Sequence, residues 1–522
     1  MHTVTQKYKQ SIYAPNRNIV GRVTFDISDV TAVGDITAIT TTAQASISDK
    51  SQLANKVRSA TYNLATWETD RFLLDGSFSF PDDTIANNGE MGFVSDHLCG
   101  ADGVFASYPT ITFDFGSTHS SVGLTITFDA FNEEYATDFD VTAYDAVGGV
   151  IEHVSVTGNT DVMAKPMGQL ADYKKVVIII KKWSRGDRRA RVLEVDFGIV
   201  EVYTDDSLIS LNLIEDMDMI TAQLPSPEFE FTVDNSERLF NILNPTGFYR
   251  YLQERQQVIG EIGVDIGAGV IEWIPLGNYL LWEWTSDEGS LTASFTARTN
   301  LDLMANFDYE QLTPVNRSLY ALAEVLFAVC GITNYWIDPA LQSITTNSLA
   351  KKATCRDVLQ MIAIAGCANI FVTRANVITL KCLTFGAAVD SVTLDEMYNE
   401  AQIKLEPVVR QVQVTHWSNL DASAITTINN PVATVGDVLK LENNTLINDS
   451  ARASAVANWI LAQKAYRAAY RLNWRGNPAH ELSDIISIEN SYGGNMEAFV
   501  TKNDIRYAGY LEATSEAKGG VN

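Results

Sequence analysis

The chain has 522 residues, enough for three or four domains of about 100–200 residues, each with its own core. Its 64 Asp and Glu outnumber its 38 Lys and Arg, and a net charge of −26 would repel a phosphate backbone, which argues against sequence-specific nucleic-acid binding. The apolar run 176–180 is far shorter than a membrane span, and the polar start of the chain predicts no secretory signal.

The first 200 residues predict strands separated by turns. Alternating apolar and polar residues indicate strands at 22–27 and 36–41. From residue 60 to 203, close β segments punctuated by Gly, Asp and Asn predict an antiparallel sandwich or jelly roll. Its expected strands are 110–115, 123–129, 138–144, 150–156, 174–181 and 192–203.

The rest of the chain mixes strands with a few helices. Strands are expected at 208–214, 228–233, 258–264, 279–284 and 291–297. Helical spacing of apolar residues predicts helices at 319–330, closed by Gly331, at 354–366, and at 450–470. Further strands are expected at 368–373, 377–382, 402–405, 409–416, 483–489, 497–503 and 505–512.

The motifs of known catalytic sites fail at defining residues. The segment 480–484 (HELSD) has only the first His of a zinc-protease pair, Gly267-Ala268-Gly269 lacks the third Gly of a dinucleotide loop, and Gly-x-Ser-x-Gly does not occur. The acidic pairs Asp82-Asp83 and Glu133-Glu134 fit solvated loops better than a glycosidase site. We therefore expect no enzymatic activity, no metal and no organic cofactor.

The five cysteines are few, odd in number and without a CxxC pair. We expect them to be reduced and buried, in a protein made in a cytosol.

One segment is unusual in this acidic chain, because residues 181–191 (KKWSRGDRRAR) gather cations around a Trp. As a ligand site, Trp183 would stack on a sugar ring while Arg185, Arg188 and Arg189 bind hydroxyls, carboxylates or phosphates. Trp67 could line the same end of the sandwich or belong to its core. The simpler alternative is an interface or an intramolecular salt-bridge cluster that offsets the acidic surroundings.

Several segments, in order along the chain, resemble the tail-tip or baseplate hub proteins of bacteriophages, also called tail-associated proteins. The first group is 209–215 (ISLNLIE), 229–235 (FEFTVDN), 240–247 (FNILNPTG) and 274–284 (IPLGNYLLWEW). The second group is 354–359 (TCRDVL), 475–486 (RGNPAHELSDII) and 507–511 (YAGYL). The family usually has Gly where Ser483 stands, so we expect a differently bent turn there.

The resemblance implies a homotrimeric ring that closes the distal end of the tail tube, built from two tube-like split β-barrels with helical and α+β domains around them. Its implied partners are the distal tail protein, the tail tube and a tape-measure protein or central spike. It also implies assembly in the bacterial cytoplasm and residence in the virion. An acidic channel would let DNA slide without binding.

Residues 59–203 look like an insertion into the first barrel. Segments 74–77 (LDGS), 123–129 (GLTITFD), 138–144 (DFDVTAY) and 189–198 (RARVLEVDFG) are similar to galactose-binding-like, discoidin-type domains, which commonly bind glycans through loops. Host cell-wall glycan is therefore a candidate ligand, although inserted copies of this fold also serve as scaffolds.

The predicted fold is mainly β with α+β parts. The first hub barrel is expected at 1–58 and 204–310, a helical α+β domain at 311–390, and the second barrel, with its long helix, at 391–522. Two alternatives stay open: a glycan-active enzyme with carbohydrate-binding modules, and the hub of a contractile bacteriocin or injection system.

Overall fold

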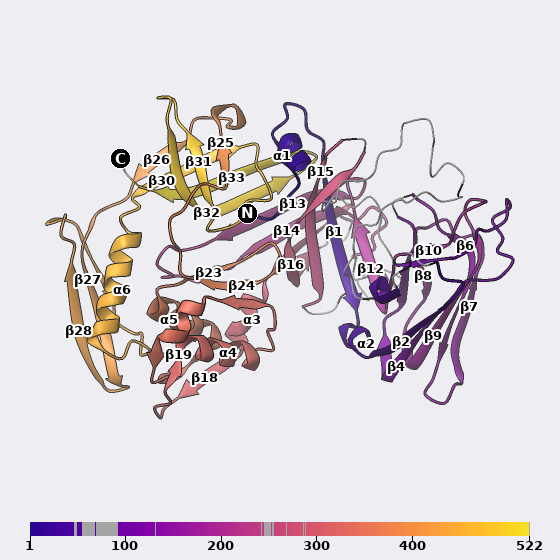
Figure 1. Ribbon diagram of the computed structural model, residues 1–522, viewed down its shortest axis with the longest axis horizontal. Coiled ribbons are helices and arrows are strands. Elements are labelled where there is room, and N and C mark those ends of the chain that lie inside the picture. Colours follow the sequence, from indigo (N-terminus) through magenta and orange to yellow (C-terminus); the bar gives the residue numbers. More distant parts are fainter. Residues whose placement is uncertain are drawn as a thin grey trace.

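The computed structural model describes residues 1–45, 48, 50–54, 68, 92–130, 132–241, 243–244, 252, 255–267, 269–285, 287 and 289–520. The mainly β fold with α+β parts is confirmed. The molecule is elongated, with a sandwich at one end, a large sheet in the middle and a helical part beneath and beside that sheet (Figure 1). No helix in the described ranges has the length and apolar character that crossing a membrane requires.

A 13-stranded sheet unites segments from both ends of the chain. Across the sheet the order is β12 (Gly198–Tyr203), β1 (Ile19–Ser28), β15 (Gln257–Asp265), β16 (Ile271–Thr285), β17 (Thr292–Arg298), β14 (Glu228–Asp234), β13 (Leu208–Asp216), β32 (Asn495–Tyr507), β33 (Leu511–Gly519), β30 (Ala468–Trp474) and β26 (Gln402–Leu405). β31 (Ile485–Glu489) pairs with β32, and β25 (Asp390–Val392) pairs with β31. The sequence-based prediction of two barrel domains therefore corresponds to two halves of one sheet.

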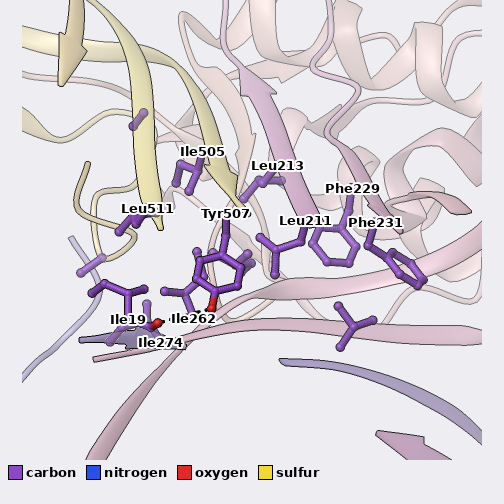
Figure 2. Packing of buried hydrophobic residues seen from close by; sticks show 14 of the residues in the cluster. Ile19, Leu211, Leu213, Phe229, Phe231, Ile262, Ile274, Ile505, Tyr507 and Leu511 are labelled. Carbon is purple, nitrogen blue, oxygen red and sulfur yellow. Dashed lines mark hydrogen bonds between the residues drawn. The ribbon is translucent and has the colours of Figure 1, made fainter. Parts of the chain in front are cut away.

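The two halves meet where β13 and β32 run antiparallel, from Leu211 opposite Tyr507 to Asp216 opposite Lys502. Figure 2 shows Tyr507 among Leu211, Ile19 and Ile262; its hydroxyl donates to Asp205 Oδ1 (2.6 Å) and lies 3.3 Å from the Ile19 carbonyl oxygen. Gly21 permits this contact, because a Cβ there would lie 2.7 Å from the Tyr507 ring. The sheet halves consequently share one apolar core.

Helix α1 (Gln6–Ile12) packs against the same core through Tyr8 and Ile12. Thr5 caps it by accepting the Tyr8 amide (3.0 Å).

The sandwich has a five-stranded sheet, β2 (Ile36–Thr42), β4 (Thr110–Ser121), β9 (Leu170–Trp183), β6 (Ala136–Tyr144) and β7 (Val150–Val156). Its other strands are β11 (Glu194–Asp196), β5 (Leu124–Thr127) and β8 (Met163–Met167), with β10 (Arg191–Val192) pairing β3 (Phe93–Val94); α2 (Val30–Gly34) and the 3-10 turn η1 (Lys50–Leu53) lie beside them. All these sheets contribute to one core.

The sandwich begins before residue 59, where the sequence placed its boundary. β2, assigned from sequence to the first barrel, pairs with β4, and β12, assigned to the insert, pairs with β1. The alternating pattern identified both strands but contains no information on which sheet each one joins.

The remaining elements surround a second core of helices and small sheets. Its helices are α3 (Asn300–Leu303), α4 (Leu319–Val329), α5 (Cys355–Gly366) and α6 (Ser450–Gln463), with 3-10 turns η3 (Met304–Asn306) and η4 (Pro339–Ser343). The 3-10 turn η5 (Leu394–Glu396) instead packs against the core of the large sheet through Leu394. The sheets are β20 (Tyr335–Ile337), β24 (Ile378–Lys381) and β23 (Asn369–Val372); β18 (Asp308–Gln311) with β22 (Ala350–Thr354); β19 (Arg317–Ser318) with β21 (Thr345–Thr346); and β28 (Ala422–Asn429), β27 (Val409–Asn419) and β29 (Asp437–Leu441).

Two predictions for this part differ from the structure. Helix α6 ends at Gln463, not at residue 470, because the alternating segment that follows forms β30 on the large sheet. Val412 and Val414 of β27 and Val456 of α6 pack with α4 and α5, so residues 409–463 belong to this core and not to the second barrel.

Of the five free cysteines, Cys99 and Cys355 are buried as predicted, whereas Cys330, Cys367 and Cys382 are only half-buried. Burial raises the pKa of Cys330 and of Cys382, each to about 12, so these thiols are protonated at neutral pH.

Candidate functional site

The cation-rich segment closes one end of the sandwich, where β9 ends at Trp183. The Trp183 side chain is buried, with 1% of its surface exposed, and its ring meets Phe128 edge-on at 5.8 Å between centroids. Its indole nitrogen donates to Oε2 of Glu134 (3.0 Å). Trp183 thus presents no open ring face on which a sugar could stack.

Glu134 brings the next cations together around one buried carboxylate. Arg188 Nε donates to its Oε1 (3.0 Å), and both side chains are almost fully buried. Arg185 lies further out, with Nη1 3.8 Å from Oε1 and 60% of its side chain exposed. The expectation of a solvated Glu133-Glu134 loop is therefore wrong for Glu134: its charge is buried and needs these donors.

Glu68 holds the other half of the segment. Arg191 donates to it through both terminal nitrogens (2.7 and 2.6 Å), and the Arg189 backbone amide adds a third bond (2.9 Å). The Arg189 guanidinium instead donates to the Ser95 carbonyl (2.6 Å). Burial opposes the charge on Arg191, but Glu68 and Asp129 outweigh it and raise the pKa of that guanidinium above its usual value.

The predicted site residues thus divide between two carboxylates. Trp183, Arg185 and Arg188 surround Glu134, and Arg189 lies beside Glu68 through its backbone. Contacts within the domain engage all four, as in an intramolecular salt-bridge cluster. Trp67, the segment 74–77 and the pair Asp82-Asp83 lie outside the described residues. Glycan binding at this end of the sandwich stays a prediction.

Two exposed side chains near this segment were missed from the sequence. Val104 forms a β-bridge with Lys182 and is 41% exposed, and Tyr108 is 48% exposed. Tyr108 precedes Pro109, whose carbonyl accepts the Ile180 amide of β9 (2.9 Å). An aromatic residue within the Ala-Ser-Tyr-Pro turn of residues 106–109 was the available signal.

A second buried polar cluster joins the large sheet to the helical part. The Arg374 guanidinium donates to both oxygens of Glu215 on β13 (2.8 and 2.7 Å) and to the carbonyls of Pro478 and His480 (3.0 and 2.8 Å). Asn503 on β32 donates to the same carboxylate (2.9 Å). Burial lowers the pKa of Arg374, but Glu215 outweighs this effect and raises it above the usual value, so the guanidinium stays charged.

The segment 475–486, singled out in the sequence, connects this cluster to the N-terminal helix. Asn477 accepts from the Tyr8 hydroxyl (2.9 Å) and donates to Asp390 (3.1 Å), which also accepts from Tyr13 (2.6 Å) and contacts His480 Nε2 (2.8 Å). Burial alone would raise the pKa of Asp390, but the bonds from His480 and Tyr13 lower it below the usual value. The network links residues more than 450 positions apart.

Ser483 adopts φ +73°, the left-handed region that glycine prefers. Its amide donates to the Val500 carbonyl (2.9 Å), which holds the turn against β32. The sequence predicts a differently bent turn at Ser483, whereas the backbone there has a conformation that suits Gly.

No family model and no curated protein matches this sequence. Among solved structures, the chain is similar to the tail protein from Neisseria meningitidis MC58 (10% identity, TM-score 0.45, covering 61% of this chain and 93% of that one). It is also similar to the 43 kDa tail protein of prophage MuSo2 from Shewanella oneidensis (11%, 0.41, 61% and 94%). A third similarity, to chitosan-binding module 1 of a Paenibacillus sp. IK-5 chitosanase/glucanase, covers 33% of this chain and 98% of that one (12%, 0.20).

Proposed function

We propose that this chain is a structural subunit of a bacteriophage tail tip: a homotrimeric hub that closes the distal end of the tail tube, organises host attachment and opens for DNA ejection. It resides in the virion after assembly in the host cytoplasm. It contacts the distal tail protein, the tail tube and a tape-measure protein or central spike, and it performs no catalysis.

The observation that carries the proposal is the position, within the fold, of the segments that resemble tail-tip hub proteins. Segments 209–215, 229–235 and 274–284 form strands of one half of the large sheet, and 507–511 ends β32 and begins β33 in the other half. Segment 475–486 lies at the buried network that ties α1, β25 and the loop at Arg374 together. A part that closes a tube under load requires such a continuous, internally fixed body.

The charge of the chain fits the same role. At −26, its surface repels a phosphate backbone, which favours passage of DNA over its retention.

The sandwich is proposed to contact host cell-wall glycan through the exposed side chains at its cationic end. Tyr108 offers a ring face and Arg185 a guanidinium fork, whereas Trp183 and Arg188 hold the loop in place. Tyr108→Ala and Arg185→Ala should each reduce pull-down of the protein by purified cell wall several-fold. Gln169→Ala, in the exposed turn between β8 and β9 of the same domain, is the matched control; equal pull-down of all four proteins would exclude this contact.

The tail-tip assignment is tested by immunogold labelling of intact tailed particles with antibody against this chain. Gold at the distal end of the tail supports it, and gold along the tube, on the capsid or absent from particles contradicts it. Incubation of the same protein with purified cell wall should release no reducing sugar or peptide; release would favour the glycan-active enzyme.

A further inference from the structure

Strand β28 is a long, open and uncharged edge. Among the described residues it pairs only with β27, whose other side pairs with β29. Residues 422–436, which comprise β28 and the following loop, contain no charged side chain. Ile425, Val432 and Val435 in this segment are 64%, 90% and 82% exposed.

Edge strands of soluble proteins are usually protected from pairing by charges, Pro, bulges or short length. β28 spans eight residues and contains neither charge nor Pro. Its unpaired backbone groups are therefore available for strand addition.

The sandwich has a second open edge on β7 (Val150–Val156), which carries one charged side chain, Glu152. Within the described ranges, β7 pairs only with β6. Residues 146–151, which lead into this strand and begin it, are uncharged, and Val147, Val150 and Ile151 are 92%, 59% and 38% exposed.

The two edges lie at opposite ends of the longest axis of the molecule (Figure 1). Two copies of a chain with net charge −26 repel each other, so contact between copies is least costly where both surfaces carry little charge, as at β28 and the uncharged start of β7. A contact between different surfaces at opposite ends joins copies head to tail, an arrangement that forms a closed ring when the rotation between successive copies closes and an open filament when it does not.

We propose that β28 of one copy pairs with β7 of the next copy, so that the two sheets continue across the junction. Backbone N–H and C=O groups of the two edges bond to each other, and Ile425 and Val432 pack against Val147 and Val150. This inference deepens the proposed function and rests on its premise that copies of this chain adjoin.

The test uses the full chain with a lysine on either edge, Ile425→Lys or Val150→Lys, and sedimentation velocity at tens of micromolar protein. The wild type should self-associate, and each variant alone should be monomeric. An equimolar mixture should form a 1:1 dimer, because Ile425→Lys keeps an intact β7 and Val150→Lys keeps an intact β28. Tyr492→Lys, at a 97% exposed hairpin residue, should associate like the wild type.

Variants that associate like the wild type, a monomeric wild type, or a mixture that stays monomeric would each overturn the inference. Unchanged far-UV circular dichroism and melting temperature verify that the lysine variants fold. Gold at the tail tip combined with any of these results would leave the proposed function standing without this interface. If the equimolar mixture forms the 1:1 dimer but no gold lies at the tail tip, the interface between copies stands and the proposed function fails.

Discussion

At the scale of single residues, burial decides what each cation of residues 181–191 does. Arg188 and Arg185 contact the same carboxylate, but one is buried and the other is largely exposed. An exposed ion pair contributes little to the free energy of unfolding. Removal of one partner of a buried pair lowers that free energy strongly, because it leaves an uncompensated charge in the interior.

Arg188→Ala should therefore lower the free energy of unfolding of the sandwich by about 3 kcal/mol, since Glu134 loses its buried cation. Arg185→Ala should change it by less than about 0.5 kcal/mol. Urea unfolding followed by tryptophan fluorescence measures both variants. Equal destabilisation by the two substitutions would contradict the assignment of Arg188 as the buried partner of Glu134 and of Arg185 as the exposed one.

At Ser483 a substitution is expected to increase the free energy of unfolding instead of lowering it. A residue with a Cβ in the left-handed region costs about 1–2 kcal/mol relative to Gly, and the added flexibility of Gly in the unfolded chain offsets about 0.4–1 kcal/mol of that cost. Ser483→Gly should therefore stabilise the protein modestly, seen as a higher denaturation midpoint. Ser483→Ala is the control and should give no gain; a lower midpoint for the Gly variant would show that the Ser side chain stabilises the turn.

The composition of the cation cluster was visible in the sequence, but its partners were not. Glu134 and Glu68 lie about 50 and 120 positions before the arginines they hold. No local pattern links residues so far apart, so the sequence alone could not separate a ligand site from a salt-bridge cluster.

At the scale of elements, local signals located strands and helix starts well. The alternation at 36–41 and 138–144 corresponds to β2 and β6, and Thr354 caps α5 by accepting the Asp357 amide (3.1 Å). The prediction of which strands pair was less successful. The strand β2 was assigned to the first barrel, but it pairs with β4 in the sandwich. Pairing depends on distant segments, which alternation does not encode.

The joint between α2 and β4 should be sensitive to acid. His119 Nε2 lies 2.9 Å from Asp35 Oδ2, and the Ser117 amide and hydroxyl donate to the same oxygen (2.6 and 2.7 Å). The bonds from His119 and Ser117 lower the pKa of Asp35 to about 2.

Because the pKa of Asp35 is lower in the folded chain than in the unfolded one, its contribution to stability is present above about pH 4 and disappears as the pH falls towards about 2. Asp35→Asn should flatten the dependence of the free energy of unfolding on pH in this range. Denaturant titrations at several acidic pH values measure it, and identical slopes for both proteins would contradict the assignment.

At the scale of the whole molecule, the decisive feature is the junction of β13 and β32. It joins residues almost 300 positions apart and turns two segments of similar texture into one sheet. The Arg374 and Asn477 networks then fix the helical part and α1 to that sheet. This continuity is the basis for proposing a force-bearing hub, and neither composition nor periodicity could reveal it.

The measurement that tests the central claim most directly is a cryo-EM reconstruction of the distal end of the tail. We expect three copies of this chain around a three-fold axis, with their 13-stranded sheets closing the tube. A distal tail without density for the 13-stranded sheet, or with six copies in its ring, would contradict it.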